Sequence, residues 1–246
     1  MYCARFVFAF LIAVAFVHTV YAQEQQRAQS VVILHGIAKT SASMRSVEKL
    51  LQKEGYKTLS ITYPSQKNSI DDIASYLREE HLNDAFWENA DNVHIVTHSM
   101  GGLVARRYLD TYKDDIPEDK LGRVVMLAPP NGGSEVADTI HGLSLYQWFY
   151  GPAGEELTTE VQSKNGSTVY YDLGIIAGTK EWPYPVAAFI VPGESDGRVS
   201  VEKTKLDGMA DHVSVSATHT FIMNKKDVHK QLLHFLKEGA FENEDE

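Results

Sequence analysis

The segment IVTHSMGGL, Ile95 to Leu103, restricts the fold of this 246-residue chain more than any other stretch. Its first residues are apolar, as in a buried strand, and helical spacing begins directly after Ser99. The chain must reverse tightly at Ser99, and residues packed near such a turn must be small, a need that Gly101 and Gly102 meet. The pattern predicts a strand and a helix joined at one serine, with the free N–H groups of the helix beneath its hydroxyl.

Strands and helices alternate along the rest of the chain. Apolar runs predict strands at 31–34, 56–63, 93–97, 124–128, 172–177 and 212–217, and helical spacing predicts helices at 43–53, from 69 onward, at 100–112 and at 225–236. This alternation predicts an α/β fold, a mostly parallel sheet with helices on both faces. The glycine-containing stretch 131–170 has few clear periods, so we expect a short lid-like insertion there. We expect residues 23–246 to form one domain, because that length is normal for a single α/β unit and no internal repeat or second domain is visible.

The first 22 residues have the pattern of a signal peptide. Arg5 precedes an apolar run at 6–17, and Val20-Tyr21-Ala22 places small residues before a cleavage point. The run is shorter than the roughly 20 apolar residues that span a bilayer, although an uncleaved anchor is the alternative. We expect cleavage after Ala22 and export of the chain, to the periplasm or out of the cell.

Composition excludes several classes of function. The only cysteine, Cys3, lies in the signal segment, so the mature chain has no disulfide or thiol chemistry. The net charge of −10 argues against nucleic acid as a partner, because binding to phosphates requires clustered Lys and Arg. No metal site is expected, since His94 and His98 lie on a strand and no H-E-x-x-H motif occurs.

Ser99 is the candidate nucleophile. A serine between a strand and a helix matches the nucleophile elbow, usually written G-x-S-x-G, except that Thr97 replaces the first glycine. The alternative is a serine that only caps an ordinary helix. A serine hydroxyl is a weak nucleophile at neutral pH, so the chemical interpretation requires a base beside it.

His219 is the candidate base. In enzymes with this elbow the acid and then the histidine follow the serine along the chain. His219 lies just after the last predicted strand and before the last helix, in ATHTF, where a loop at the carboxyl edge of the sheet can reach Ser99. His141, in the insertion, remains an alternative.

Asp196 is the candidate acid. It lies in VPGESDGRVS, residues 191–200, a segment rich in turn formers that follows the fifth predicted strand. Its expected role is to accept a hydrogen bond from His219 and stabilise the imidazolium. Glu194 is the alternative acid, and the Asp-Gly pair could also be an ordinary turn.

The oxyanion hole requires two backbone donors. One is the N–H of Met100, which follows the nucleophile, and the other should come from the loop after the first predicted strand. In that loop, LHGIA, Gly36 allows a backbone turn that points the Ile37 N–H inward. We expect His35 to support the loop by hydrogen bonding.

Five segments resemble those of bacterial exported α/β-hydrolases of the lipase and esterase family. They are VVILHG at 31–36, THSMGG at 97–102, APPNGGSEVAD at 128–138, ESDGRVSVEKT at 194–204 and THTFIM at 218–223, in family order. The resemblance implies the α/β-hydrolase fold and hydrolysis of carboxylic esters through an acyl-serine intermediate. It also implies the same three catalytic residues and no cofactor.

The expected partner is a small-molecule or lipid ester. The aromatic residues Tyr146, Trp148, Phe149 and Tyr150 suit an acyl pocket or a peripheral lipid contact, and equally the buried face of a short helix. The shortness of the insertion argues against long-chain triglycerides. Thioesterase, amidase and acyltransferase activities use the same three residues and remain alternatives, as does a catalytically silent binding protein.

Overall fold

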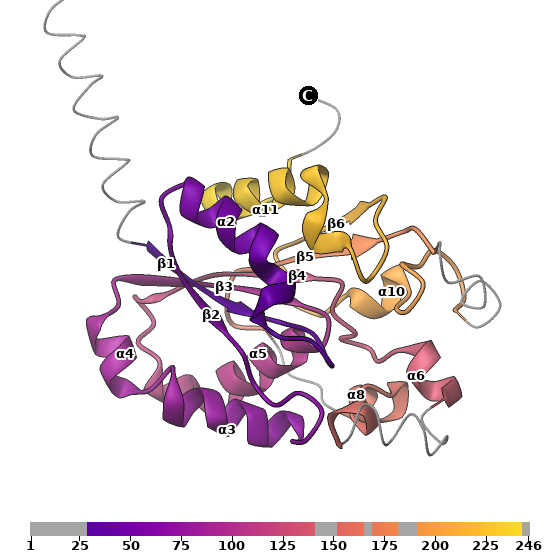
Figure 1. Ribbon diagram of the computed structural model, residues 1–246, viewed down its shortest axis with the longest axis horizontal. Helices are drawn as coiled ribbons and strands as arrows, with labels where there is room; N and C mark the ends of the chain where they lie inside the picture. The colour runs from indigo at the N-terminus through magenta and orange to yellow at the C-terminus, as the bar shows by residue number, and fades with distance from the viewer. Residues whose placement is uncertain (1–28, 141–151, 165–168, 182–190, 243–246) are drawn as a thin grey trace, which may run out of the picture.

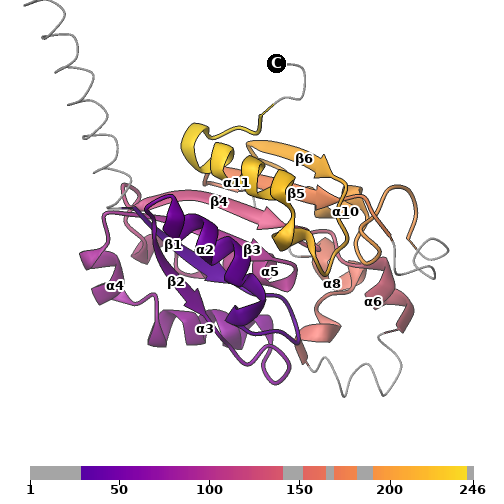
Figure 2. The same cartoon turned by 45° about the horizontal axis from the view of Figure 1, so that its top comes forward.

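The computed structural model describes residues 29–140, 152–164, 169–181 and 191–242, and its centre is a parallel sheet. The six strands lie in the order β2-β1-β3-β4-β5-β6 (Figure 1). They are β1 (Gln29–Leu34), β2 (Lys57–Ile61), β3 (Asn92–His98), β4 (Leu121–Leu127), β5 (Leu173–Gly178) and β6 (Asp211–Val215). All carboxyl ends therefore meet at one edge, on the right in Figure 2.

The central strands are apolar because both of their faces are buried. The last four residues of β1, Val31 to Leu34, are at most 1% exposed, and all six residues of β5 are buried. On β3, Val93 and Ile95 pack into one cluster of apolar side chains and Val96 into another, on the opposite face. This two-sided burial explains why the strands appear in the sequence as continuous apolar runs.

Helices cover both faces of the sheet. The helices α2 (Arg45–Lys53) and α11 (Lys226–Glu238) lie on one face, and α3 (Ile70–Glu80) and α5 (Met100–Thr111) lie on the other (Figure 1). Two-sided cover is what a parallel sheet with crossover helices requires. The predicted parallel sheet with helices on both faces is therefore present.

Local signals set several helix ends. Ser69 caps α3 by accepting a hydrogen bond from the Asp72 N–H, and the Asp72 carboxylate accepts one from the Ser69 N–H. Gly239 ends α11 in the left-handed conformation, at a φ of 81°. The short helix α4 (Asp84–Asn89), capped by Asn83, was not predicted, because six residues are too few for a visible helical period.

Some element boundaries differ from the prediction. The strand β4 begins at Leu121, three residues earlier than expected, because Gly122 and Arg123 separate Leu121 from the apolar run. The second predicted strand, 56–63, is shorter as β2 (Lys57–Ile61), and the residues after it leave the sheet and approach the loop that follows β1. Tyr63 and Ser65, which follow β2, are hydrogen-bonded to that loop.

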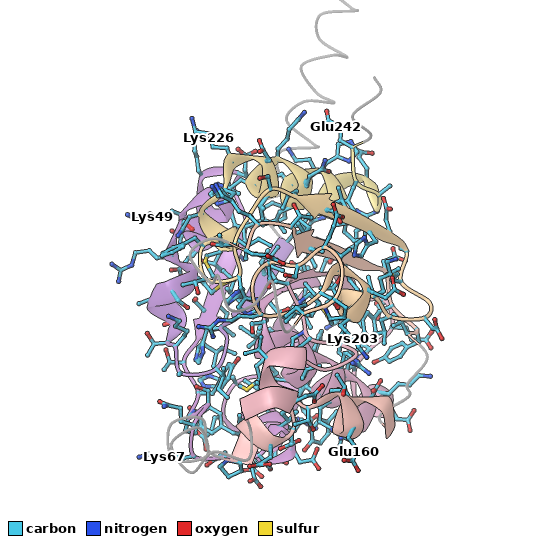
Figure 3. The ribbon with its side chains drawn as sticks, turned by 90° about the vertical axis from the view of Figure 1, so that its right-hand side faces the viewer. Lys49, Lys67, Glu160, Lys203, Lys226 and Glu242 are labelled. Carbon is cyan, nitrogen blue, oxygen red and sulfur yellow. The ribbon has the colours of Figure 1, made fainter. Side chains whose placement is uncertain are left out.

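The described part of the 131–170 stretch is helical and lies beyond the carboxyl edge of the sheet. It contains α6 (Glu135–Ile140), a helical turn at 152–155 and α8 (Thr159–Lys164). Figure 3 looks onto this side of the molecule and labels Glu160 of α8 and Lys203 of α10 (Val201–Thr204). The aromatic group at 146–150 and the predicted signal segment lie outside the described residues.

Hydrogen bonds tie this stretch to the rest of the molecule. The Glu156 carboxylate accepts a hydrogen bond of 2.9 Å from the Ile70 N–H at the start of α3. The Ser134 hydroxyl donates to the Arg198 carbonyl at 2.7 Å, which joins the stretch to the segment after β5.

Among the described residues, no helix has the length and apolar character to cross a membrane.

Candidate active site

The chain turns at Ser99 with a backbone conformation that a serine rarely adopts. Its φ is 54° and its ψ is −128°, between the last residue of β3 and the first residue of α5. The Ser99 N–H donates to the Leu127 carbonyl at the end of β4, at 2.9 Å, which anchors the turn to the sheet. A non-glycine residue at positive φ is strained and persists only where surrounding contacts enforce it.

Close backbone packing explains the two glycines after the serine. A Cβ at Gly101 would lie 2.7 Å from the carbonyl oxygen of His35, so α5 can approach the loop after β1 only without a side chain there. At Gly102 a Cβ would lie 3.0 Å from the Pro129 side chain and 3.4 Å from the Thr97 hydroxyl. The missing side chain at Gly102 thus lets α5 pack closely against Pro129, while Thr97, the departure from the usual motif, lies at ordinary contact distance.

The structure brings His219 to Ser99. The Nε2 atom of His219 lies 2.8 Å from the Ser99 hydroxyl oxygen, and both side chains are buried. His219 lies between β6 and α11, as predicted, in a loop at the carboxyl edge of the sheet. A histidine at this distance can accept the hydroxyl proton as the oxygen attacks a carbonyl carbon.

Asp196 completes the row on the far side of the imidazole. One carboxylate oxygen lies 2.7 Å from Nδ1 of His219, and the other accepts hydrogen bonds of 2.9 Å from the N–H groups of Arg198 and Val199. The Asp196 carbonyl also accepts from the His219 N–H at 3.0 Å. Asp196 is fully buried, and both of its carboxylate oxygens are hydrogen-bonded. Because the carboxylate is fixed in this way, it holds the ring of His219 in one orientation.

Of the two carboxylates considered from the sequence, the structure thus places Asp196 against the base. The Glu194 side chain is exposed, and the Glu194 carbonyl accepts from the Val201 N–H instead. His141, the alternative base, lies outside the described residues. Among the described residues, no group of three or more His, Cys, Asp or Glu side chains is placed to hold a metal ion.

Gly178 at the end of β5 is a site residue that sequence reasoning missed. A Cβ there would lie 2.5 Å from the Ala217 carbonyl oxygen and 2.8 Å from Cβ of Asp196. The absence of a side chain at Gly178 lets the turn that contains Asp196 meet the loop that contains Ala217 and His219 at the end of β5. The available signal was a glycine directly after a buried strand, next to the predicted edge of the site.

His98 is hydrogen-bonded to the loop that carries His219. Its Nε2 atom donates a hydrogen bond of 2.9 Å to the His219 carbonyl, and the two rings lie 5.1 Å apart. Burial, with a smaller contribution from the nearby His219, lowers the pKa of His98 well below its usual value. His98 is therefore neutral at physiological pH and adds no charge beside the base.

The loop after β1 reaches the other side of Ser99. A Cβ at Gly36 would lie 3.1 Å from Cβ of Ser99, so the loop touches the nucleophile here. No described residue accepts a hydrogen bond from the N–H of Ile37 or of Met100. The two predicted oxyanion donors adjoin Gly36 and Ser99 in the chain and have no hydrogen-bond acceptor among the described residues, and donors for a developing negative charge must be unpaired in this way.

Comparison with protein families matches residues 31–213 to a family described as the alpha/beta hydrolase family. The match spans most of the chain and confirms the predicted α/β-hydrolase fold. No curated protein in the comparison matches the sequence.

Several solved structures share the fold at low sequence identity. The mature form of the Bacillus licheniformis lipase BlEst2 is 19% identical, with a TM-score of 0.65 over 85% of this chain and 91% of that one. The metagenomic carboxyl esterase MGS0156 is 16% identical, with a TM-score of 0.62 over 79% and 65%. The RedJ thioesterase from Streptomyces coelicolor is 12% identical, with a TM-score of 0.53 over 86% of each chain. At these identities the likeness extends to the fold alone.

Proposed function

Because the chain belongs to the alpha/beta hydrolase family, we propose that it is a serine hydrolase that cleaves carboxylic esters through an acyl-serine intermediate. The observation that carries the proposal is the row of two short contacts, 2.8 Å from Ser99 to His219 and 2.7 Å from His219 to Asp196. It occurs at a strained turn whose flanking N–H groups are unused. Each of the four parts of acyl-transfer chemistry then has a residue: nucleophile, base, orienting acid and oxyanion donors.

The reaction follows from this arrangement. The Ser99 oxygen attacks the ester carbonyl carbon while Nε2 of His219 takes the hydroxyl proton, and the carbonyl oxygen becomes an oxyanion bound by the N–H groups of Ile37 and Met100. Collapse of this intermediate breaks the bond to the alcohol, which leaves with the proton from His219. A water molecule then attacks the acyl-serine, again with His219 as base, and releases the carboxylic acid.

The same residues could act on thioesters or amides or transfer the acyl group to an alcohol. We propose ester hydrolysis because the family resemblance in the segments around Ser99 and Asp196 is to lipases and esterases. Rates on an oxyester, a thioester and an amide with the same acyl group distinguish these reactions, and release of free acid rather than a new ester excludes acyl transfer.

Replacement of the nucleophile tests the proposal most directly. We expect the wild type to hydrolyse p-nitrophenyl esters and S99A to lose at least about 10⁵-fold in kcat, because the substitution removes the oxygen that forms the acyl intermediate. A fluorophosphonate should label the wild type at Ser99, as peptide mass spectrometry would locate. The matched control is S43A, which removes a serine hydroxyl that donates to the nearby Thr40 carbonyl, away from Ser99.

Two results would overturn this proposal. Wild-type protein that neither hydrolyses short or long acyl esters nor reacts with the fluorophosphonate would leave a binding role as the better account. Activity retained in S99A would show that another residue carries the chemistry.

A further inference from the structure

The segment after β2 packs against the loop that carries the proposed oxyanion donor. Tyr63 and Ser65 follow β2 by two and four residues, and both are almost fully buried. The phenol ring of Tyr63 stacks on the imidazole of His35, with 4.0 Å between ring centres and 11° between the planes. Neither residue hydrogen-bonds to the three residues aligned at Ser99, so the reaction outlined above gives them no role.

Tyr63 fixes the first half of the loop through His35. Its backbone N–H donates to Nε2 of His35 at 3.2 Å, which leaves Nδ1 to donate to the Gly36 carbonyl at 2.8 Å. The Tyr63 hydroxyl donates to the His35 carbonyl. Tyr63 therefore binds both the ring and the carbonyl of His35. The next residue in the chain, Gly36, is the one that lies against Ser99.

Ser65 fixes the second half of the loop. Its hydroxyl oxygen accepts a hydrogen bond of 3.1 Å from the N–H of Ala38. Ala38 has a φ of 55°, a conformation that an alanine adopts only when its surroundings impose it. Ile37 thus lies between two fixed points, His35 bound to Tyr63 and Ala38 bound to Ser65.

From these contacts we propose that Tyr63 and Ser65 are positioning residues that hold the Ile37 N–H toward Ser99 and so preorganise the oxyanion hole. The proposal rests on the proposed function, since it takes Ile37 as an oxyanion donor. A preorganised donor needs no rearrangement when charge develops, so its benefit is greatest in the transition state. Loosening the loop should therefore lower kcat while KM changes little.

The experiment compares Y63F and S65A with the wild type on p-nitrophenyl butyrate. Y63F keeps the ring stacked on His35 and removes only the hydroxyl, and S65A removes only the acceptor for Ala38. Because removal of a whole oxyanion donor costs about 10²- to 10³-fold, we expect roughly tenfold losses in kcat for these indirect changes, with KM within about twofold. The matched control is Y108F, which removes another buried tyrosine hydroxyl, one that donates to the Leu82 carbonyl and accepts from the Trp87 indole N–H, away from the loop.

A second measurement separates positioning from general loss of structure. Phenylboronic acid forms a tetrahedral adduct with an active serine, so its Ki should rise in Y63F and S65A in proportion to the fall in kcat/KM. Y108F should lower the melting temperature without changing Ki or kcat. Unchanged kcat and Ki in both Y63F and S65A, with an active wild type, would overturn this inference alone. An inactive wild type that is not labelled by fluorophosphonate would instead overturn the proposed function.

Discussion

His94 and His98 lie on the same face of β3, four residues apart, and belong to opposite edges of the sheet. His94, at the amino edge, accepts a hydrogen bond from the Arg123 N–H at 2.9 Å and lies 3.2 Å from the Gln29 amide oxygen. His98, at the carboxyl edge, donates to the carbonyl of His219. Burial lowers the pKa of both, that of His94 to about 4. The two rings lie on the same face of the same strand and are both neutral, but they are hydrogen-bonded to different parts of the molecule.

The difference lies in the segments to which each histidine is bound. His94 connects Gln29, the first residue of β1, with Arg123, the third residue of β4, and both belong to the sheet. His98 holds a loop, and that loop carries the base of the proposed reaction. In a parallel sheet with helices on both faces, loops that carry function gather at the carboxyl edge. We therefore expect changes at the carboxyl edge to affect catalysis and changes at the amino edge to affect stability.

A cleft lies away from Ser99, at the opposite edge of the sheet. Its volume is about 770 Å³, and it lies at the amino edge, bounded by His94, Arg123 and Asp172 among other residues. In this cleft Arg123 donates to the carbonyls of Leu236 and Lys237, and His94 is hydrogen-bonded to the Arg123 N–H and to the Gln29 side chain. The alignment of hydrogen bonds at Ser99 is thus a more specific signal of chemistry than the volume of a cleft.

The largest effect at the carboxyl edge is expected from D196N. The amide can still accept from the two backbone N–H groups, but its NH₂ would face Nδ1 of His219 and favour the wrong tautomer. The same change lowers kcat by about 10⁴-fold in a serine protease of a different fold that uses the same three residue types. The measurement is kcat on a p-nitrophenyl ester, with circular dichroism to verify the fold. The control is E194Q, the other carboxylate considered from the sequence, for which we expect activity within twofold of the wild type.

An intermediate effect is expected from loss of the hydrogen bond beneath His219. H98A and H98N leave the His219 carbonyl without a donor at the Nε2 position, whereas the amide of H98Q can reach it. We expect kcat to fall roughly 10- to 100-fold in H98A and H98N, because small misplacements of a base are costly. H98Q should stay within about threefold of the wild type. Equal losses in all three variants would show that the ring itself, and not its hydrogen bond, is required.

The contrast between the edges also explains how much could be predicted from the sequence. The parallel sheet and the elbow at Ser99 followed from apolar runs and from turn residues beside them, and the order of the acid and the base was taken from enzymes with this elbow. These features are local in the chain, so a single sequence displays them. Asp196 and His219 could be proposed because each lies directly after or between predicted elements at one known edge.

Contacts between distant segments could not be predicted in the same way. The approach of Tyr63 and Ser65 to the loop after β1 joins residues 27 or 28 positions apart, and it depends on β2 ending earlier than its apolar run suggested. The role of Gly178 requires knowledge that two loops meet over the end of β5. Such contacts depend on strand register and strand ends, which are the least certain features of a sequence prediction.

The smallest expected effect on catalysis is that of replacing His94, which tests the difference between the amino and carboxyl edges of the sheet most sharply. Its pKa falls from 6.5 in the unfolded chain to about 4 in the folded one, mainly through burial. Between these values the unfolded state binds more protons, so stability is complete above about pH 7 and decreases as the pH falls toward 4.

Replacement of His94 by glutamine removes this titration and leaves that of His98 in place. Between pH 7 and pH 4.5, H94Q should lose about 2 kcal/mol less of its unfolding free energy than the wild type, as denaturant titrations at the two pH values would measure. Its kcat at pH 7 should equal that of the wild type, since His94 is bonded only to strand residues. The same acid sensitivity in both proteins would contradict the low pKa of His94, and a large loss of kcat in H94Q would contradict the separation between the two edges.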